Sequence, residues 1–217
     1  MNLHQSIGRT FAATAAPTVA GVLGAGQAVA SDSVRPEQDP IPASAEVQQQ
    51  RDLADGKLDP EHLAHKQAKD AEELRLGIAP LSGGARVPTT TVERDGNVYY
   101  APLGVNGQAE VENNLCAYGQ VCLYYNSGLR NANFPRKGTS AQLSNYSGYT
   151  YNNGRGLPGY GQGVKNNAAS IMNGYEGKPS FGVFYNSGWK GDRGWFIAGD
   201  GRNLPSWLKN ENASGRF

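Results

Sequence analysis

The sequence has 217 residues, a formal net charge of +1 and 38% hydrophobic residues, which is enough material for one or two domains. Its three histidines lie at positions 4, 62 and 65, which excludes a histidine-dependent serine or cysteine active centre from the C-terminal half. Lysine and arginine form no run longer than a pair, and we therefore do not expect a nucleic-acid-binding protein.

The first 30 residues have the features of an export signal. Arg9 precedes an apolar, alanine-rich run from Thr10 to Val29, which ends in the small-x-small sequence Ala28-Val29-Ala30. A membrane anchor is the alternative, but Pro17 and three glycines interrupt a run that is barely long enough to span a bilayer. We therefore expect a signal peptide at 1–30, a secreted product and no stable membrane association after cleavage.

Residues 31–84 are predicted to form a partly helical leader or pro-segment, with a solvated linker helix as the alternative. Asp59-Pro60 is a helix start signal, and Gly56 separates this helix from an earlier, shorter one. A weakly amphipathic stripe comprises Leu63, Gln67, Ala71 and Leu74. Residues 31–80 carry eleven acidic and six basic side chains and no aromatic ring. The leader is therefore poor material for an independent core, and its net charge of −5 would suit contact with a basic domain.

Residues 85–113 are predicted to form a hairpin and a linker, because two strand-like runs flank Asp95-Gly96, a common type I′ turn pair. Residues 114–217 carry a net charge of +7, from eleven basic and four acidic side chains. Short apolar runs alternate there with turns rich in glycine and asparagine: Val121–Tyr125, Gly182–Tyr185 and Gly194–Ala198. This pattern predicts an all-β domain.

Cys116 and Cys122 are the only cysteines of the chain. In an exported protein such a closely spaced pair is expected to form a disulfide. Half of a zinc site is the alternative, but a second pair of ligands is missing because no histidine follows position 65.

The β domain contains an internal repeat. Tyr-Asn-Ser-Gly occurs at 125–128 and again at 185–188. Each copy is followed by an apolar-Lys-Asn-(Asn/Glu)-x-Ala-Ser loop, at 164–170 and at 208–214. The spacing is longer in the first copy, and the excess lies in Thr139–Gly163. Two copies of one β motif are therefore expected to bury a shared core.

A strand that ends in a tyrosine-led turn and is followed by an N-N-x-x-S loop resembles the βγ-crystallin pattern. The Cys116-x5-Cys122-Leu-Tyr opening, the two-motif length and the export signal are more narrowly similar to the I36 peptidase-inhibitor family. These secreted bacterial proteins are typified by a Streptomyces metalloproteinase inhibitor. The resemblance covers about Asn114–Phe217 and implies a βγ-crystallin-like sandwich of two Greek-key motifs.

The resemblance also implies a secreted inhibitor that blocks an extracellular protease, with a metalloprotease favoured, by means of a rigid exposed loop. Candidate loops are Lys178–Gly188 and Thr139–Gly163, and the inhibitory residue is unknown. Inhibitory members are expected to have a second short disulfide, for which Lys178–Gly188 has no cysteine. The alternative is therefore a non-inhibitory extracellular module that binds calcium or a surface glycan.

No enzyme is predicted. The acids of the β domain are few, and none forms an evident catalytic carboxylate pair: Glu176, Asp192, Asp200 and Glu211. No phosphate-binding loop or dinucleotide fingerprint is present.

Calcium is the one cofactor considered, because the loops of βγ-crystallins bind it through oxygens. The candidate ligands are Asn166, Asn167 and Ser170 in the first loop, and Asn210, Glu211 and Ser214 in the second. We expect weak or absent binding, since Ca²⁺ prefers six to eight oxygens with some carboxylates and only Glu211 is charged. Alternatively, the asparagines satisfy loop backbone groups and the serines cap the turns.

Overall fold

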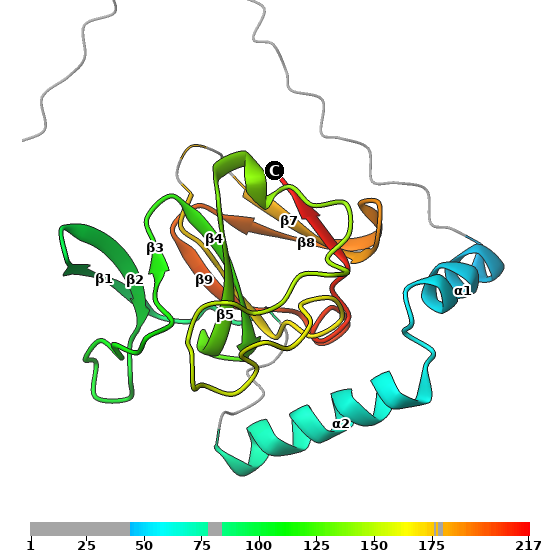
Figure 1. Ribbon diagram of the computed structural model, residues 1–217, viewed down its shortest axis with the longest axis horizontal. Coiled ribbons are helices and arrows are strands. Elements are labelled where there is room, and N and C mark those ends of the chain that lie inside the picture. The colour runs from blue at the N-terminus through cyan, green and yellow to red at the C-terminus, as the bar shows by residue number, and fades with distance from the viewer. Residues whose placement is uncertain (1–43, 78–83, 176, 178–179) are drawn as a thin grey trace, which may run out of the picture. The chain divides into compact units, whose positions relative to one another are not determined.

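The computed structural model describes residues 44–77, 84–175, 177 and 180–217 (Figure 1). The predicted signal peptide lies outside the described residues. The helical elements are α1 (Ala45–Ala54), α2 (Pro60–Arg75) and the 3₁₀ turn η1 (Gly138–Ala141). The strands are β1 (Thr89–Arg94), β2 (Asn97–Pro102), β3 (Cys116–Ala117), β4 (Gln120–Asn126), β5 (Arg130–Lys137), β6 (Ser170–Asn173), β7 (Ser180–Asn186), β8 (Lys190–Ile197), β9 (Asp200–Asn203) and β10 (Ser214–Arg216). The described residues are therefore mostly β-sheet, which confirms the prediction of an all-β fold class.

The two predicted helices are present, and their start signal acts as expected. Asp59 Oδ1 accepts a hydrogen bond from Glu61 N at 2.9 Å, and Pro60 occupies the first turn of α2. Gly56 separates the helices with a φ of 72°, a conformation that favours glycine. All described residues, helices included, belong to one compact unit.

The predicted apolar stripe of α2 does not face the rest of the protein. Leu63 and Leu74 are 43% and 68% exposed, whereas Lys69 and Glu73 are buried. The leucines of the weakly amphipathic stripe are therefore solvated, and the helix buries charged side chains instead.

The hairpin predicted within residues 87–100 is confirmed. β1 and β2 pair antiparallel, with Arg94 opposite Asn97, and Asp95 and Gly96 both have positive φ, as a type I′ turn requires. β3 adds to β2 and completes a three-stranded sheet.

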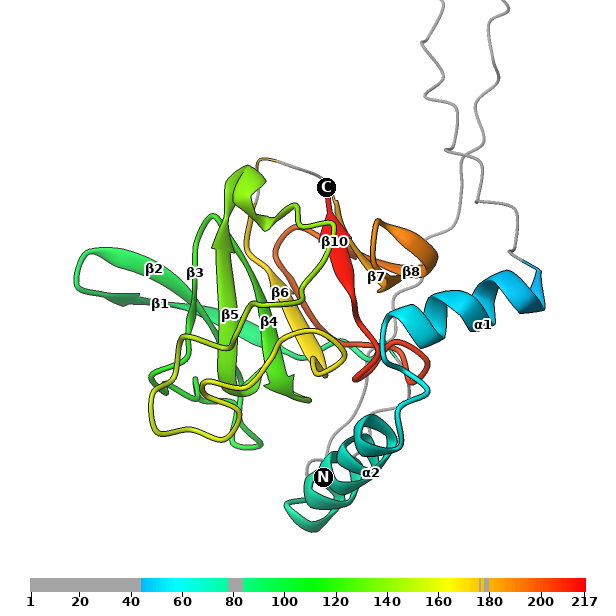
Figure 2. The same cartoon turned by 45° about the vertical axis from the view of Figure 1, so that its right-hand side comes forward.

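The two sequence repeats have equivalent strand pairings (Figure 2). β4 lies between β5 and β6, and β7 lies between β8 and β10. The repeats also exchange a segment: β9, from the second repeat, pairs with β6 of the first, so that Ile171 faces Arg202. Conversely, Leu143 of the first repeat bridges Gly215 in β10 of the second. Each sheet is therefore completed by the other repeat.

One core is shared by the four-stranded sheet β5-β4-β6-β9 and the three-stranded sheet β10-β7-β8. Along β4, alternate residues face opposite sides, as expected for a strand buried on both faces. Its Val121 and Leu123 pack with the side chains of several other elements: Phe134, Ile171, Phe181, Val183 and Phe196. Cys122 and Tyr124 point to a second cluster with Tyr100 and Met172, which joins the hairpin sheet to the domain. The expectation of a shared core for the two repeats is confirmed.

Cys116 and Cys122 form the predicted disulfide, which links β3 to β4 and is fully buried. Both thiols are therefore consumed, and the zinc alternative is excluded. In the part of the chain that the structure describes, no helix has the length and apolar character needed to cross a bilayer.

The two candidate inhibitory loops have different structures. Lys178 and Pro179 lie outside the described residues, but Ser180–Asn186 is β7, the central strand of its sheet. The expectation of an exposed loop at Lys178–Gly188 is therefore wrong for that part, because Phe181, Val183 and Phe184 fill the core. Thr139–Gly163 is irregular after η1 and remains a candidate.

Candidate functional site

The two Tyr-Asn-Ser-Gly turns are fastened by the serines of the loops that follow them. Ser170 Oγ donates to Asn126 O at 2.6 Å and accepts from Leu129 N at 3.0 Å. The same two bonds, at 2.7 and 3.1 Å, join the corresponding residues of the second repeat: Ser214, Asn186 and Trp189. The serine hydroxyls are thus engaged with the turns, as the capping alternative predicted.

The two Lys-Asn loops cross each other. Asn166 N donates to Asn212 O at 2.6 Å, and Asn210 N donates to Ala168 O at 2.8 Å. Asn166 and Asn210 both adopt a left-handed conformation, with φ of 55° and 59°, which asparagine tolerates better than most residues. Because the loops cross, side chains from different repeats meet at two places.

At the first of these places the loops enclose a lysine of α2. The first lysine site consists of Lys69 with Tyr125, Asn167 and Asn210. Lys69 Nζ donates to Tyr125 O and Asn167 O at 2.7 Å, and to the side-chain oxygens of Asn210 and Asn167 at 2.8 and 3.0 Å. It also lies 3.8 Å from the centroid of the Tyr125 ring. Four neutral oxygens and an aromatic face therefore surround one buried amine.

The second lysine site consists of Lys57, between the helices, with Tyr185, Asn166 and Glu211. Lys57 Nζ donates to Asn166 Oδ1 at 3.0 Å and to Glu211 O, and it lies 3.8 Å from Glu211 Oε2. The centroid of the Tyr185 ring is 4.0 Å away. Lys57 is only 2% exposed.

The two lysine sites are equivalent by position in the repeats. Tyr125 and Tyr185 are the first residues of the two Tyr-Asn-Ser-Gly copies. In each loop the lysine is followed by an Asn-Asn or Asn-Glu pair. Each site combines the first side chain of the pair in one loop with the second side chain of the pair in the other loop. Asn167 and Glu211 occupy that second position, and this exchange of an amide for a carboxylate is the main chemical difference between the sites.

A buried carboxylate accompanies the first lysine site. Glu73, one helical turn after Lys69, accepts from Ser127 N and from Ser127 Oγ, both at 2.9 Å. Its second oxygen also pairs with Lys209 Nζ at 2.7 Å. The serine of the first Tyr-Asn-Ser-Gly copy and the lysine of the second loop therefore hold one acid of α2.

Asp55 repeats this arrangement at the second lysine site. Its carboxylate accepts from Ser187 Oγ at 2.7 Å, from Ser187 N at 3.0 Å and from Lys165 Nζ at 2.8 Å. Ser187 and Lys165 are the counterparts of Ser127 and Lys209 in the repeats. The helical segment thus presents two acid–lysine pairs to two equivalent receptors.

The ionisation of these groups reflects their burial. Burial lowers the pKa of Lys57 to about 8, although the carboxylates of Glu211 and Asp55 act in the opposite direction. Burial also lowers the pKa of Lys69 well below its usual range, against the carboxylate of Glu73. For Asp55, burial alone would raise the pKa, but the bonds from Lys165 and Ser187 lower it to about 2. Burying these charges therefore costs desolvation free energy, which well-placed hydrogen bonds and opposite charges must offset.

Further polar residues of α2 surround the lysine sites. Lys66 Nζ lies 2.7 Å from Glu211 Oε1, and His62 Nε2 lies 3.2 Å from Glu211 Oε2. His65 Nε2 lies 3.1 Å from Asn167 Oδ1. A groove of about 230 Å³ borders the first lysine site, and one of about 400 Å³ borders the second.

Sequence reasoning found part of this arrangement. Four of the six predicted calcium ligands contribute oxygens to the lysine sites: Asn166, Asn167, Asn210 and Glu211. Ser170 and Ser214 bind the turns instead. The missed residues of the leader are Asp55, Lys57, Lys69 and Glu73. On the β domain, the tyrosines and serines of the two Tyr-Asn-Ser-Gly copies and the two loop lysines were seen as parts of the repeat but not as site residues. The opposite net charges of leader and domain were the available signal, and they did not identify particular side chains.

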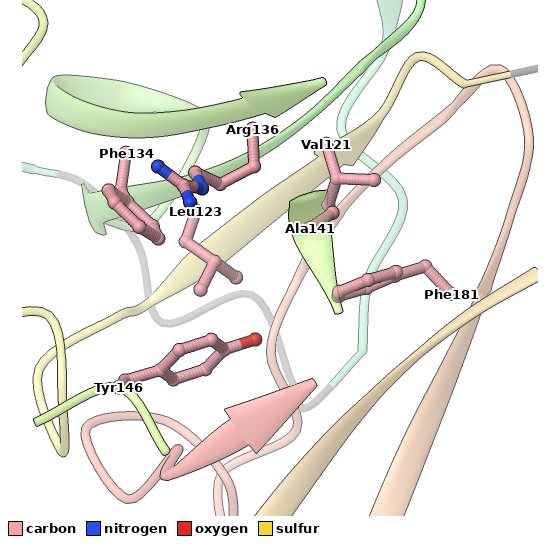
Figure 3. Close-up of a pocket in the computed structure, with 7 residues that line it drawn as sticks. All are labelled: Val121, Leu123, Phe134, Arg136, Ala141, Tyr146 and Phe181. Carbon is pink, nitrogen blue, oxygen red and sulfur yellow. The ribbon is translucent and has the colours of Figure 1, made fainter. Parts of the chain in front are cut away.

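A small cavity in the core is unsuited to a ligand (Figure 3). It measures about 10 Å³ and is lined by Val121, Leu123, Phe134, Arg136, Ala141, Tyr146 and Phe181. That volume is at most enough for one water molecule. Among the described residues, no group of three or more His, Cys, Asp or Glu side chains is placed to hold a metal ion.

Comparison with known proteins adds no identification: no protein-family model matches the chain, and no curated protein matches its sequence.

Proposed function

We propose that the chain is an exported, non-catalytic binding protein whose β domain is a βγ-crystallin-like sandwich of two Greek-key motifs. The equivalent pairings of β4 and β7 and the exchange of β9 between repeats support this architecture. The buried disulfide supports an oxidising compartment. Its function in this proposal is to inhibit an extracellular protease, with a metalloprotease favoured.

The observation that carries the inhibitor proposal is the fixation of the exposed segment Thr139–Gly163. Tyr146 and Tyr151 are fully buried, while residues between and after them are exposed. Tyr146 N donates to Ala213 O at 2.8 Å, and Asn153 pairs through its backbone with Asn133. An inhibitory loop needs such preorganisation, because ordering a flexible loop on the protease would weaken binding.

The proposal is tested by titrating the full chain against a thermolysin-like metalloprotease and a subtilisin-like serine protease. We expect stoichiometric inhibition of one of them, measured as residual activity on a small substrate. Arg155→Ala and Tyr160→Ala, at exposed positions of the segment, should weaken inhibition by about tenfold. Arg94→Ala, on the separate hairpin, is the matched control and should inhibit normally. Full protease activity in the presence of excess uncleaved wild-type protein would exclude the inhibitor function.

A second candidate function is cation binding by the β domain, and the two lysine sites favour it. Their oxygens converge on positions that already hold amines, so the donor set fits a cation. If calcium bound there, Asn166, Asn167, Asn210 and Glu211 would hold it and it would cross-link the two loops. Calcium titration of a chain that lacks the two lysine amines tests this candidate, and an absence of binding would exclude it.

A further inference from the structure

The leader docks on the β domain through charges rather than apolar surface. The leucines of α2 are largely exposed, while Lys69 and Glu73 are 5% and 2% exposed. A helix usually gains most of its stability from an apolar face packed on the core. Here the docking free energy depends instead on two buried acid–lysine pairs, so the receptors for those pairs must be well formed.

The atoms that receive each lysine are suited to any small hard cation. The Nζ atoms of Lys57 and Lys69 donate to oxygens of two kinds, backbone carbonyls and side-chain amides. Such oxygens, with carboxylates, are the ligands of Ca²⁺. The second lysine site adds the Glu211 carboxylate. The remaining coordination positions of an ion could be filled by water.

A lysine amine and a metal ion cannot occupy one site together. Ca²⁺ lies about 2.3–2.6 Å from its oxygen ligands. In the first lysine site the Nζ atom already lies 2.7–3.0 Å from the four oxygens that such an ion would use. The two cations would therefore overlap, and binding one requires the other to leave.

We propose that the segment Ala45–Arg75 is a built-in ligand whose Lys57 and Lys69 occupy two cation sites of the β domain, so that docking of the helices and binding of a divalent cation exclude each other. This proposal rests on the cation-binding candidate function.

Covalent connection gives the leader an advantage over free ions. A tethered group acts at an effective concentration in the millimolar range when its linker is short. The acids Asp55 and Glu73 add to that advantage, because they bind Ser187 and Ser127 at the same time. Free calcium must therefore displace two coupled pairs to bind. By linkage, calcium should weaken docking by the same factor by which docking weakens calcium binding.

The first test compares the full wild-type chain with the Lys57→Met/Lys69→Met variant, in which the side-chain stems remain and the amines are lost. Terbium serves as the probe for calcium, with excitation through tyrosine, because the Tyr125 and Tyr185 rings lie within about 4 Å of the nitrogen positions. We expect the variant to bind terbium about tenfold or more tightly than the wild type, and excess calcium to displace it. Lys190→Met, at an exposed lysine, is the control and should match the wild type.

The second test needs no variant. Calcium at high concentration should accelerate amide exchange in α2 of the wild-type chain, because the helices must leave for the ion to bind. Near-ultraviolet circular dichroism verifies that the double variant keeps its core. If the core is lost, the two single variants are used in place of the double variant. Each single variant should then open one site.

Two results would overturn the proposal, and they are distinguishable. If no lysine variant with a native core binds terbium or calcium, cation binding itself is wrong. If the wild type and the variants bind equally well, and α2 exchange is unchanged by calcium, cation binding stands but the helices do not compete with it.

Discussion

The two lysine sites hold the same amine by different means. In the first, Lys69 is surrounded by neutral oxygens, and its nearest buried acid, Glu73, comes from the same helix. In the second, Glu211 of the β domain supplies a carboxylate, which Lys66 and His62 also contact. One substitution between the repeats, asparagine against glutamate, therefore decides whether the receptor itself is charged. The first site should depend on hydrogen-bond geometry, and the second on electrostatics.

The largest effect is expected at the acid of the first site. Glu73→Ala should lower the free energy of unfolding by about 3–5 kcal/mol, because it leaves Ser127 without its buried partner and Lys209 with the half-exposed Asp70 as its remaining acid. Denaturant titration measures the loss, and amide exchange should place it in α2. Glu72→Ala is the matched control, since Glu72 is exposed and pairs with Arg75 on the surface of the same helix. Equal effects of the two substitutions would contradict the assignment.

Neutralising the second site should have a smaller effect. Glu211→Gln keeps the side-chain shape but removes the charge near Lys57, Lys66 and His62, and should cost about 2 kcal/mol. The loss of unfolding free energy should be smaller at high salt, because salt screens the partly exposed pair of Glu211 with Lys66. Thermal unfolding at two salt concentrations measures it. Asp192→Asn, an exposed acid of the same repeat, should be neutral, and a loss of similar size there would point to net charge rather than the site.

The smallest effect on stability is expected from lowering the pH. Burial alone would raise the pKa of Asp55, but the hydrogen bonds from Lys165, Ser187 and Asn186 lower it from 3.8 to about 2. Since the folded state releases this proton more readily than the unfolded chain, Asp55 contributes its full stabilisation above pH 3.8 and loses it as pH falls through about 2.

The amide resonance of Ser187, which donates to Asp55, reports this titration. Its midpoint should lie near pH 2 in the wild type, and the Asp55→Asn variant should show no such transition. A midpoint close to 3.8 would mean that the carboxylate is not held by Ser187 and Lys165.

Local sequence signals predicted local structure well. Asp59-Pro60, Asp95-Gly96 and the cysteine pair each specify a feature within a few residues, and each formed as expected. The doubled Lys-Asn loop also predicted equivalent positions in the repeats, because both copies carry the same turn chemistry.

Long-range polar contacts could not be predicted in this way. Hydrophobic periodicity indicated only a weakly amphipathic stripe with Leu63 and Leu74, which are exposed, and gave no sign that Lys69 and Glu73 are the buried side chains. Lys69 lies 98 residues from Asn167, and nothing in the spacing of either residue indicates their contact. Likewise, Lys178–Gly188 was interpreted as an inhibitory loop from the family resemblance, whereas its strand-like run Gly182–Tyr185 lies in a central strand whose phenylalanines fill the core.

The crossing of the loops has a consequence for how the protein matures. Each lysine site combines residues of both repeats. A chain that has only its first repeat therefore contains neither complete receptor. The lysines of the leader therefore find all their partners only when Asn210 and Glu211 of the second loop lie beside the first loop. Docking of the leader thus requires both halves of the β domain to be in place, and a mispaired second loop would leave the lysines without receptors.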